Sequence, residues 1–372
     1  MKISAPPAKS TFRARALAFL HSCVASPLNA LVTVAVIAVV FWTLPGLVRW
    51  LLLDAVWSGT SGKDCVGHEG ACWIFLYART DQLLYGSYPA DERWRLAAAA
   101  IVGIADVAAM VGLHRYLRLP ATGMMLLLGS LAIGVLVVGG VAGLPYVPTG
   151  NLGGVLLTAI IATWTIVTAL PLGLLLALAR QSELPVISAI AASCIDLVRS
   201  LPLVGLLFLM IVMFPLFVPP GFETDKLMRA LVAFTIFNAA NFAEVFRGGL
   251  QAIPHGQIEG GYSLGLPKWR VTALIVVPQA IAVSVPAAVN ICIAIIKETT
   301  IVLILGLFDL IGVLQSGIAD PDWLMAESVR TTAYVFAGLV FWAICFSFSR
   351  YSMALERRNP MTAAARGVGF VA

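Results

Sequence analysis

Long apolar runs recur through most of this 372-residue chain, and they constrain its fold more than any other feature. A helix needs about 20 apolar residues to cross a hydrocarbon core of about 30 Å. Because no water reaches that core, each span must satisfy its own backbone hydrogen bonds, which here favours helices over a barrel. Apolar residues make up 60% of the chain and charged residues 12%, against about 45–50% and about 25% in a soluble domain. The sequence therefore predicts an all-α integral membrane protein.

The apolar runs predict eight membrane spans. They cover residues 29–51, 96–113, 121–144, 155–179, 188–218, 227–248, 273–295 and 331–349. Lys and Arg are enriched in cytoplasmic loops and so set the orientation of such a chain. With the N-terminus inside, the predicted outer segments carry half as many basic residues as the inner ones. Both termini are therefore predicted to be cytoplasmic, and the scattered basic residues give no nucleic-acid-binding patch.

The chain divides by composition into an accessory part and a functional part. Residues 29–145 are mostly Ala, Val, Leu and Gly, with Asp106 as the main polar residue at depth. Residues 150–350 carry Pro, Asn, Arg, Glu and Lys inside or beside spans, where polar groups usually face the helix bundle or a cavity. We therefore expect function in the second part, with residues 1–28 as a cytoplasmic leader and residues 351–372 as a cytoplasmic tail.

The longest hydrophilic stretch, residues 54–95, is predicted to lie in the periplasm and contains "CVGHEGAC". In an oxidising compartment Cys65 and Cys72 can close a small loop through a disulfide. Two free thiols in a mobile loop, or a zinc site that uses His68, are the alternatives. The other four cysteines lack metal-ligand spacing, so no metal site is predicted from them.

A polar stripe marks the sixth span. Asn238, Asn241 and Glu244 recur at every third residue, and Arg247 continues the series. Such a stripe can line a passage for a polar solute. It can equally hold helices together, since amide hydrogen bonds join membrane helices at roughly 0.6–2 kcal/mol each. The residues alone leave both interpretations open.

Further polar residues stand in the fifth and seventh spans. Asp196 and Arg199 are three residues apart, so on a helix they share a face and can neutralise each other just before Pro202 interrupts the helix. Either this is a kinked, pore-lining helix whose Arg199 meets the solute or a neighbouring helix end, or the charge pair fixes the depth of the helix in the membrane. Asn290 is embedded in the seventh span. The residues predicted to line a solute pathway are Arg199, Asn238, Asn241, Glu244 and Asn290.

After the seventh span, Lys297 and Glu298 stand at its outer end, and apolar residues resume at once. We predict a re-entrant or broken helix over residues 296–320. The two charged side chains are either a proton relay or a structural ion pair. No HExxH, P-loop or GxSxG pattern occurs in the chain, so we expect no catalytic residue and no ATP hydrolysis by it.

The segment "IPHGQIEGGYSLGLPKWRVTALIVVP", residues 253–278, is compact, basic and rich in glycine between two apolar blocks. Ile258 and Tyr262 are four residues apart and give a short helix one apolar face. Gly265 provides a left-handed stop, and Pro267 suits the start of a new helix. The sequence predicts a helix–turn–helix elbow on the cytoplasmic side. Its aromatic and basic side chains suit either a protein partner or lipid headgroups.

The stretch "EGGYSLGLPKWRVTALIVVP" resembles the cytoplasmic EAA loop of ABC importer permeases, in which E-A-A, Gly, Ile and Leu-Pro stand at fixed spacing. Glu259, Gly265, Ile275 and Pro278 fall at matching positions, whereas Gly260-Gly261 replaces Ala-Ala and Val277 replaces Leu. The flanks "AEVFRGGLQAIPHGQ", "PQAI", "IKETTIV" and "LVRSLPLVGLLF" are similar to the polar amino-acid branch of these permeases. The resemblance covers residues 155–350. It implies a type I importer core of five helices, here with about three further N-terminal helices.

The extra N-terminal part further resembles the larger permease subunit of general L-amino-acid importers of the bacterial inner membrane. That resemblance implies a second homologous permease, a pair of ABC ATPase subunits and a periplasmic binding protein that delivers the L-amino acid. It also implies that this chain binds no cofactor, with ATP and Mg²⁺ held by the ATPase. The residues expected to couple to the ATPase are Glu259, Gly260, Gly261, Gly265, Trp269, Arg270, Ile275 and Pro278.

Two rival functions fit the residues less completely. A stand-alone ion-coupled carrier would use Asp106, Lys297 and Glu298 as relay groups. A non-transporting scaffold in membrane lipid would need none of these groups. Uptake that depends on a partner ATPase separates an importer from both.

Overall fold

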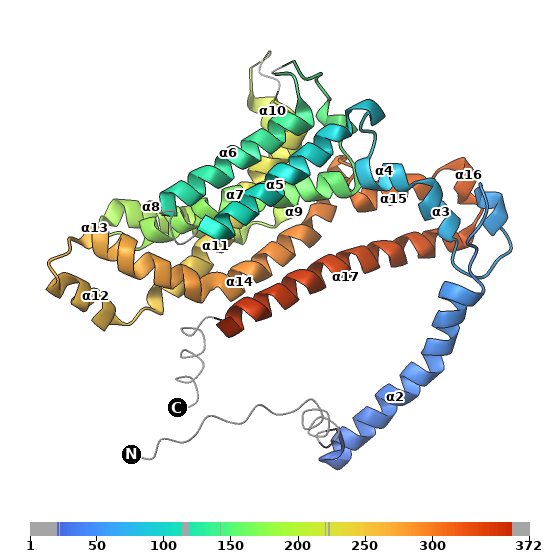
Figure 1. The fold of residues 1–372 in the computed structure, drawn as a ribbon, viewed down its shortest axis with the longest axis horizontal. Helices are drawn as coiled ribbons and strands as arrows, with labels where there is room; N and C mark the ends of the chain where they lie inside the picture. The colour runs from blue at the N-terminus through green and yellow to red at the C-terminus, as the bar shows by residue number, and fades with distance from the viewer. Residues whose placement is uncertain are drawn as a thin grey trace. The chain divides into compact units, whose positions relative to one another are not determined.

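A computed structural model describes residues 21, 23–113, 119–141, 143–219, 221 and 224–358 of the chain (Figure 1). In these ranges the chain forms helices joined by turns, and β-pairing is limited to isolated bridges. The predicted all-α architecture is therefore confirmed. Four helical segments are long and apolar enough to cross a membrane, or five if one bent pair counts as a span. The four segments are Pro27–Leu53, Gly154–Arg180, Lys268–Leu305 and Glu327–Ala354.

Each of the eight predicted spans coincides with a helical region, but the number of membrane crossings is not established as eight. The helix α11, Lys226–Gln251, carries the polar stripe, which lowers its hydropathy below that of a typical span. The helices α5, Trp94–Leu113, and α6, Leu119–Val138, adjoin residues outside the described ranges. That α5, α6 and α11 cross the membrane stays a prediction.

The predicted span over residues 188–218 is not one continuous helix. It consists of α8, Pro185–Ser200, followed by α9, Leu203–Phe208, the π-helix η5, Leu209–Met213, and α10, Phe214–Phe217. The two halves meet at an angle of 99°. Leu201 and Pro202 are extended, because proline lacks an N–H group and disfavours helical geometry in the residue before it. A sharp corner therefore replaces the predicted kink.

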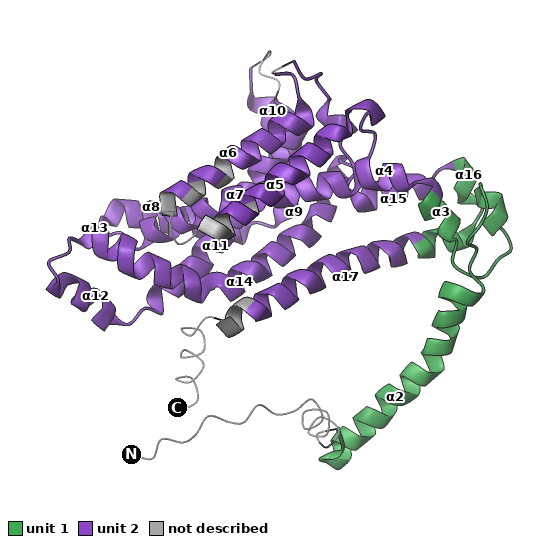
Figure 2. Cartoon of the chain, viewed as in Figure 1, with its two compact units in different colours: residues 1–77, 321–332 green, residues 78–320, 333–372 purple. Residues whose placement is uncertain are grey.

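The chain forms two compact units, shown in different colours in Figure 2. Unit 1 comprises residues 1–77 and 321–332, and unit 2 comprises residues 78–320 and 333–372. The predicted boundary between residues 145 and 150 falls inside unit 2. Unit 1 is thus made from the start of the chain and from a short segment far along it.

In unit 1, the helix α2, Pro27–Val48, starts at the N-cap Ser26 and continues as the π-helix η1, Arg49–Leu53. A helix end leaves carbonyl groups without helical partners. Two tryptophan rings supply donors for them: Trp57 Nε1 donates to the Leu52 carbonyl at 3.2 Å, and Trp73 Nε1 donates to the Leu51 carbonyl at 2.9 Å. The two rings stack with centroids 5.6 Å apart. The hydrophilic loop is thereby fixed to the end of the helix.

A disulfide joins Cys65 to Cys72 in unit 1, so in this structure they are neither free thiols nor metal ligands. The second segment of the unit packs directly against this loop. The Cys72 amide donates to Thr332 Oγ1 at 2.9 Å, and the rings of Phe75 and Trp323 meet edge to face at 5.3 Å. These contacts form the core of the unit. In the described residues no group of His, Cys, Asp and Glu is arranged to hold a metal ion.

Unit 2 begins with α4, Thr80–Tyr85, and the hairpin of α5 and α6. Arg95, the last residue of the hydrophilic stretch 54–95, is fully buried there. Its guanidinium donates to the carbonyl of Leu136 at 2.6 Å and to that of Pro145 at 2.9 Å, while Tyr88 donates to the carbonyl of Val137 at 2.8 Å. Carbonyl groups at the end of α6 are thus bound by side chains that sequence patterns do not connect.

The centre of unit 2 is the packing of α7, Gly154–Arg180, against α11. Gly173 allows a close approach, since a Cβ atom there would lie 2.5 Å from Cβ of Phe242. Thr168 and Thr235 share a hydrogen bond of 2.8 Å across the same pair of helices. Two clusters of buried apolar side chains surround this contact, one around Phe234 and the other around Phe246.

The rest of unit 2 follows α11 along the chain. It contains α12, His255–Ser263, α13, Lys268–Val271, the π-helix η6, Thr272–Val276, and α14, Val277–Glu298. The 3₁₀-helix η7, Thr299–Leu305, ends at the left-handed Gly306 and is followed by α15, Leu310–Ile318. The predicted break within residues 296–320 is therefore present. Two elements belong to the other unit in whole or in part: α16, Pro321–Leu324, lies in unit 1, and α17, Glu327–Arg358, starts there and continues in unit 2.

Candidate functional site

The elbow, residues 253–278, has the predicted helix–turn–helix form. The helix α12 ends at Ser263, Gly265 is left-handed with φ of +74°, and Pro267 is the N-cap of α13. The amide of Gly265 donates to the carbonyl of Tyr262, and the amide of Leu266 donates to that of Gly261. These bonds satisfy carbonyl groups at the end of α12 and close a tight turn. A side chain at Gly265 would strain this turn, since L-residues rarely adopt positive φ.

The two adjacent glycines of the elbow have different surroundings. Gly261 is buried, and a Cβ atom there would lie 2.9 Å from Cγ2 of Val271 and 3.0 Å from Cδ1 of Ile275. Gly260 is exposed, and no atom lies within 4 Å of its Cβ position. Gly261 therefore lets α12 approach the helix that follows it, whereas nothing within the described chain requires glycine at 260.

The inward face of α12 differs in part from the prediction. Ile258 packs against the buried cluster around Phe246, as an apolar anchor should. Tyr262 was expected to share that face, but it is 46% exposed. Gly261 takes the inward position instead, because the close approach to Val271 and Ile275 leaves no room there for a side chain.

Most of the residues expected to couple to a partner lie on the surface of the elbow. Trp269 is 65% exposed, and the guanidinium of Arg270 lies 5.0 Å from the centre of its ring. Ile275 is half-buried and Gly261 is buried, so these two shape the elbow from within. The exposed members of the set are Glu259, Gly260, Gly265, Trp269, Arg270 and Pro278.

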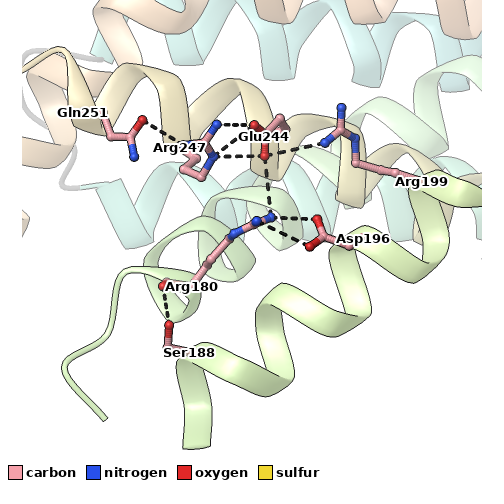
Figure 3. Close-up of polar contacts among 7 residues, drawn as sticks. All are labelled: Arg180, Ser188, Asp196, Arg199, Glu244, Arg247 and Gln251. Atoms are coloured by element: carbon pink, nitrogen blue, oxygen red, sulfur yellow. Dashed lines mark hydrogen bonds and ion pairs between the residues drawn. The ribbon is translucent and has the colours of Figure 1, made fainter. Parts of the chain in front are cut away.

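A second group of polar residues joins the ends of three helices near the elbow. We call Arg180, Asp196, Arg199, Glu244 and Arg247 the charge cluster (Figure 3). Arg247 Nε lies 3.0 Å from both carboxylate oxygens of Glu244, and Arg247 also donates to Gln251 at 2.8 Å. Arg180 and Arg199 approach Glu244 to 3.7 Å and 3.6 Å. One carboxylate on α11 therefore faces three guanidinium groups.

Arg180, at the end of α7, also makes a paired contact with Asp196 of α8, at 3.0 Å and 3.5 Å. The predicted Asp196–Arg199 pair is wrong, because each residue is paired elsewhere: Asp196 with Arg180 and Arg199 with Glu244. Sequence reasoning missed the role of Arg180, because its partners Asp196 and Glu244 lie on other helices. Three guanidinium groups and two carboxylates give the cluster a formal charge of +1.

The structure brings together only two of the five predicted pathway residues, Arg199 and Glu244. Asn238 is 1% exposed and donates to the carbonyl of Phe234 on its own helix at 3.0 Å. Asn241 is half-buried on α11, and Asn290 is exposed on α14. The hydrogen bond of Asn238 stays within α11 and joins no second helix, so both interpretations of the stripe stay predictions.

The structure also describes Asp106, Lys297 and Glu298, the groups that an ion-coupled carrier would use as a relay. The carboxylate of Asp106 on α5 packs against Gly129 of α6, with Oδ2 in the place that a Cβ atom of residue 129 would take. At the end of α14, Lys297 is exposed and Glu298 is half-buried, and among the described residues they form no ion pair with each other. The structural ion pair considered for them is therefore not formed.

Residues 169–359 match a family of proteins described as the binding-protein-dependent transport system inner membrane component. The chain is 42% identical over 333 residues, 89% of each chain, to the inner membrane amino-acid ABC transporter permease protein YhdY of Escherichia coli K12. It is 34% identical over 397 residues to the glutamate/glutamine/aspartate/asparagine transport system permease protein BztC of Rhodobacter capsulatus, covering 89% of this chain and 91% of that one.

Among solved structures, a crystal structure of an amino acid ABC transporter with histidines is 28% identical in sequence. It covers 55% of this chain and 92% of that chain, with a TM-score of 0.48. The two curated relatives, in contrast, extend over the N-terminal part as well.

Proposed function

This chain belongs to the family of binding-protein-dependent transport system inner membrane components, and on that premise we propose that it is the permease subunit through which an ATP-driven importer moves L-amino acids from periplasm to cytoplasm. One observation carries the proposal beyond family membership. The exposed elbow lies within the matched residues 169–359 and connects α11 directly to α14. A partner that moves the elbow therefore moves two helices of the core.

Membership of the family implies two kinds of partner, an ATPase and a substrate-binding protein. In more detail, a pair of ABC ATPase subunits contacts the elbow and holds ATP and Mg²⁺, and a second homologous permease completes the passage. A periplasmic binding protein delivers the amino acid. The distribution of basic residues supports cytoplasmic termini in the bacterial inner membrane.

The outer and inner surfaces of the elbow support its role as the contact with the ATPase. Its exposed surface carries an aromatic side chain beside a basic one, which is a common composition of protein interfaces. Its inner surface is anchored by Ile258 and by the close contact of Gly261. Because α13 continues through η6 into α14 without an intervening loop, a displacement of the elbow is passed along that helix.

The proposal is tested with the assembled importer in sealed vesicles. We expect uptake of radiolabelled amino acids that requires ATP, the partner ATPase and the binding protein together. A competition panel of L-amino acids then defines the substrates. Uptake that persists without the ATPase and collapses with the ion gradient would establish the carrier instead. If the fully assembled complex shows no uptake under any of these conditions, the result favours the non-transporting scaffold.

Glu259→Lys is expected to lower ATP-driven uptake while the protein remains inserted in the membrane. The exposed carboxylate would change sign on the partner-facing surface, and reversed charges at an interface cost several kcal/mol. Gly265→Asp should act similarly, since it places a charged side chain on the exposed turn, whose left-handed backbone favours glycine. Uptake and copurification of the ATPase measure both effects. Normal values for both variants would show that the elbow is not the docking site.

A further inference from the structure

An ion pair also attaches the elbow to the rest of unit 2, besides its covalent links to α11 and α14 and the packing of Ile258. Lys268, the first residue of α13, forms an ion pair with Glu183 in the turn between α7 and α8. We propose that Glu183 is a positioning residue for the coupling step: it makes the turn of residues 181–184 move together with the elbow. The inference rests on the proposed function of the elbow.

The turn that carries Glu183 is held firmly between its two helices. The Ser188 hydroxyl donates to the carbonyl of Arg180 at 2.7 Å, and the amide of Leu184 donates to the hydroxyl of Ser182 at 3.2 Å. The amides of Gln181 and Ser182 donate back into the last turn of α7. Pro185 then starts α8 with a fixed backbone angle. A displacement of Glu183 is therefore passed to both helices rather than absorbed by the turn.

The charge cluster continues the same connection. Arg180 stands at the boundary between α7 and the turn, and its guanidinium binds Asp196 on α8 and approaches Glu244 on α11 (Figure 3). Through Arg180, the turn is thus connected to α7, α8 and α11 by partly exposed side chains. Among the described residues, the ion pair of Lys268 and Glu183 joins the charged surface of the elbow to this arrangement.

The ion pair is exposed, with 53% of the Lys268 side chain and 79% of the Glu183 side chain accessible to solvent. An exposed pair adds little to stability, because solvent screens it. Its effect should therefore appear in how well elbow motion is transmitted, not in whether the protein folds. This separates a positioning role from a structural one.

The test uses the assembled importer in vesicles and measures amino acid imported per ATP hydrolysed. Glu183→Lys places a like charge opposite Lys268. We expect it to lower this ratio about two- to fivefold, which corresponds to the free energy of an exposed ion pair. Glu183→Asp should retain the ratio, and Glu183→Lys combined with Lys268→Glu should restore much of it. ATPase copurification should stay unchanged in the Glu183 variants.

A matched control comes from another exposed pair, Arg93 and Asp81, 3.0 Å apart near the start of unit 2. Asp81→Lys should leave the coupling ratio unchanged. An unchanged ratio in Glu183→Lys, with the wild-type complex active, overturns the inference and leaves the proposed function intact. Absence of ATP-driven uptake by the wild-type complex overturns the proposed function itself.

A second measurement keeps the inference testable if Glu183→Lys fails to assemble. Glu183→Cys and Lys268→Cys, joined by a short bismaleimide, replace the ion pair with a covalent link. If the turn and the elbow move together, the linked protein transports with an unchanged ratio of import to hydrolysis. If they separate during the cycle, the link blocks transport, and the inference is wrong.

Discussion

Gly261→Leu is expected to lower ATP-driven uptake by roughly tenfold or more, because the new side chain has no space between α12 and the helix that follows it. Even a Cβ atom would lie within 3.1 Å of Val271 and Ile275 side chains. Overpacking of this kind costs about 1–3 kcal/mol, which the elbow would relieve by moving α12 outward. The exposed surface that meets the ATPase would then be displaced. Reconstituted uptake and the amount of copurified ATPase measure the effect.

Gly256→Leu is the matched control, because the same leucine is added to the same short helix. No atom lies within 4 Å of the Cβ position of Gly256, and the residue is exposed. We expect uptake by this variant to stay close to that of the unaltered protein. The Cβ position of Gly260 is also open within the chain, so the uptake of Gly260→Leu reports on contacts with a partner rather than on packing within the elbow. Equal uptake by Gly261→Leu and Gly256→Leu would contradict the packing role of Gly261.

Glu244→Gln should strongly reduce uptake and also lower the stability of the protein in detergent. The substitution leaves Arg180, Arg199 and Arg247 facing one another without the carboxylate that they share. Removing one partner from a buried ion pair costs about 3–5 kcal/mol. The side chain of Glu244 is 25% exposed, so we expect a loss nearer 1–3 kcal/mol after solvent screening. Thermal unfolding of the purified complex measures the change.

Asp196→Asn provides the comparison within the same cluster. Its carboxylate is 60% exposed and, among the described residues, forms an ion pair with Arg180 alone, so its loss should cost less than about 1 kcal/mol. If Glu244→Gln loses uptake but keeps binding-protein-stimulated ATP hydrolysis, Glu244 acts in the solute pathway. Loss of both activities indicates that it holds the helices together. A stability equal to that of Asp196→Asn would contradict the central place of Glu244.

The elements that the sequence could predict are those set by local patterns. Apolar runs located the helices, and Gly265 with Pro267 located the turn of the elbow, because both depend on neighbours in the chain. The apolar resumption after Glu298 likewise indicated the broken helix around Gly306. Local backbone preference decides each of these features.

Features that depend on packing between distant helices were not predictable in the same way. Nothing in the spacing of Arg180 and Glu244 connects them, since the contact arises only when α7 packs against α11. The Asp196–Arg199 pair failed for the same reason: a tertiary partner replaced a neighbour on the helix. Likewise, Tyr262 had the right periodicity but is exposed, because Gly261 faces Val271 and Ile275 of the helix that follows.

The composition of unit 1 determines how the chain could be shortened. Its second segment, residues 321–332, lies inside the family-matched region, yet it packs around the disulfide loop of the first. A permease that began at residue 78 would lose the Phe75 ring that meets Trp323 and the Cys72 amide that donates to Thr332. The N-terminal part of unit 1 therefore cannot be removed without a loss of contacts in residues 321–332. Gain or loss of that part would have to be accompanied by changes some 250 residues away, in the segment that it covers.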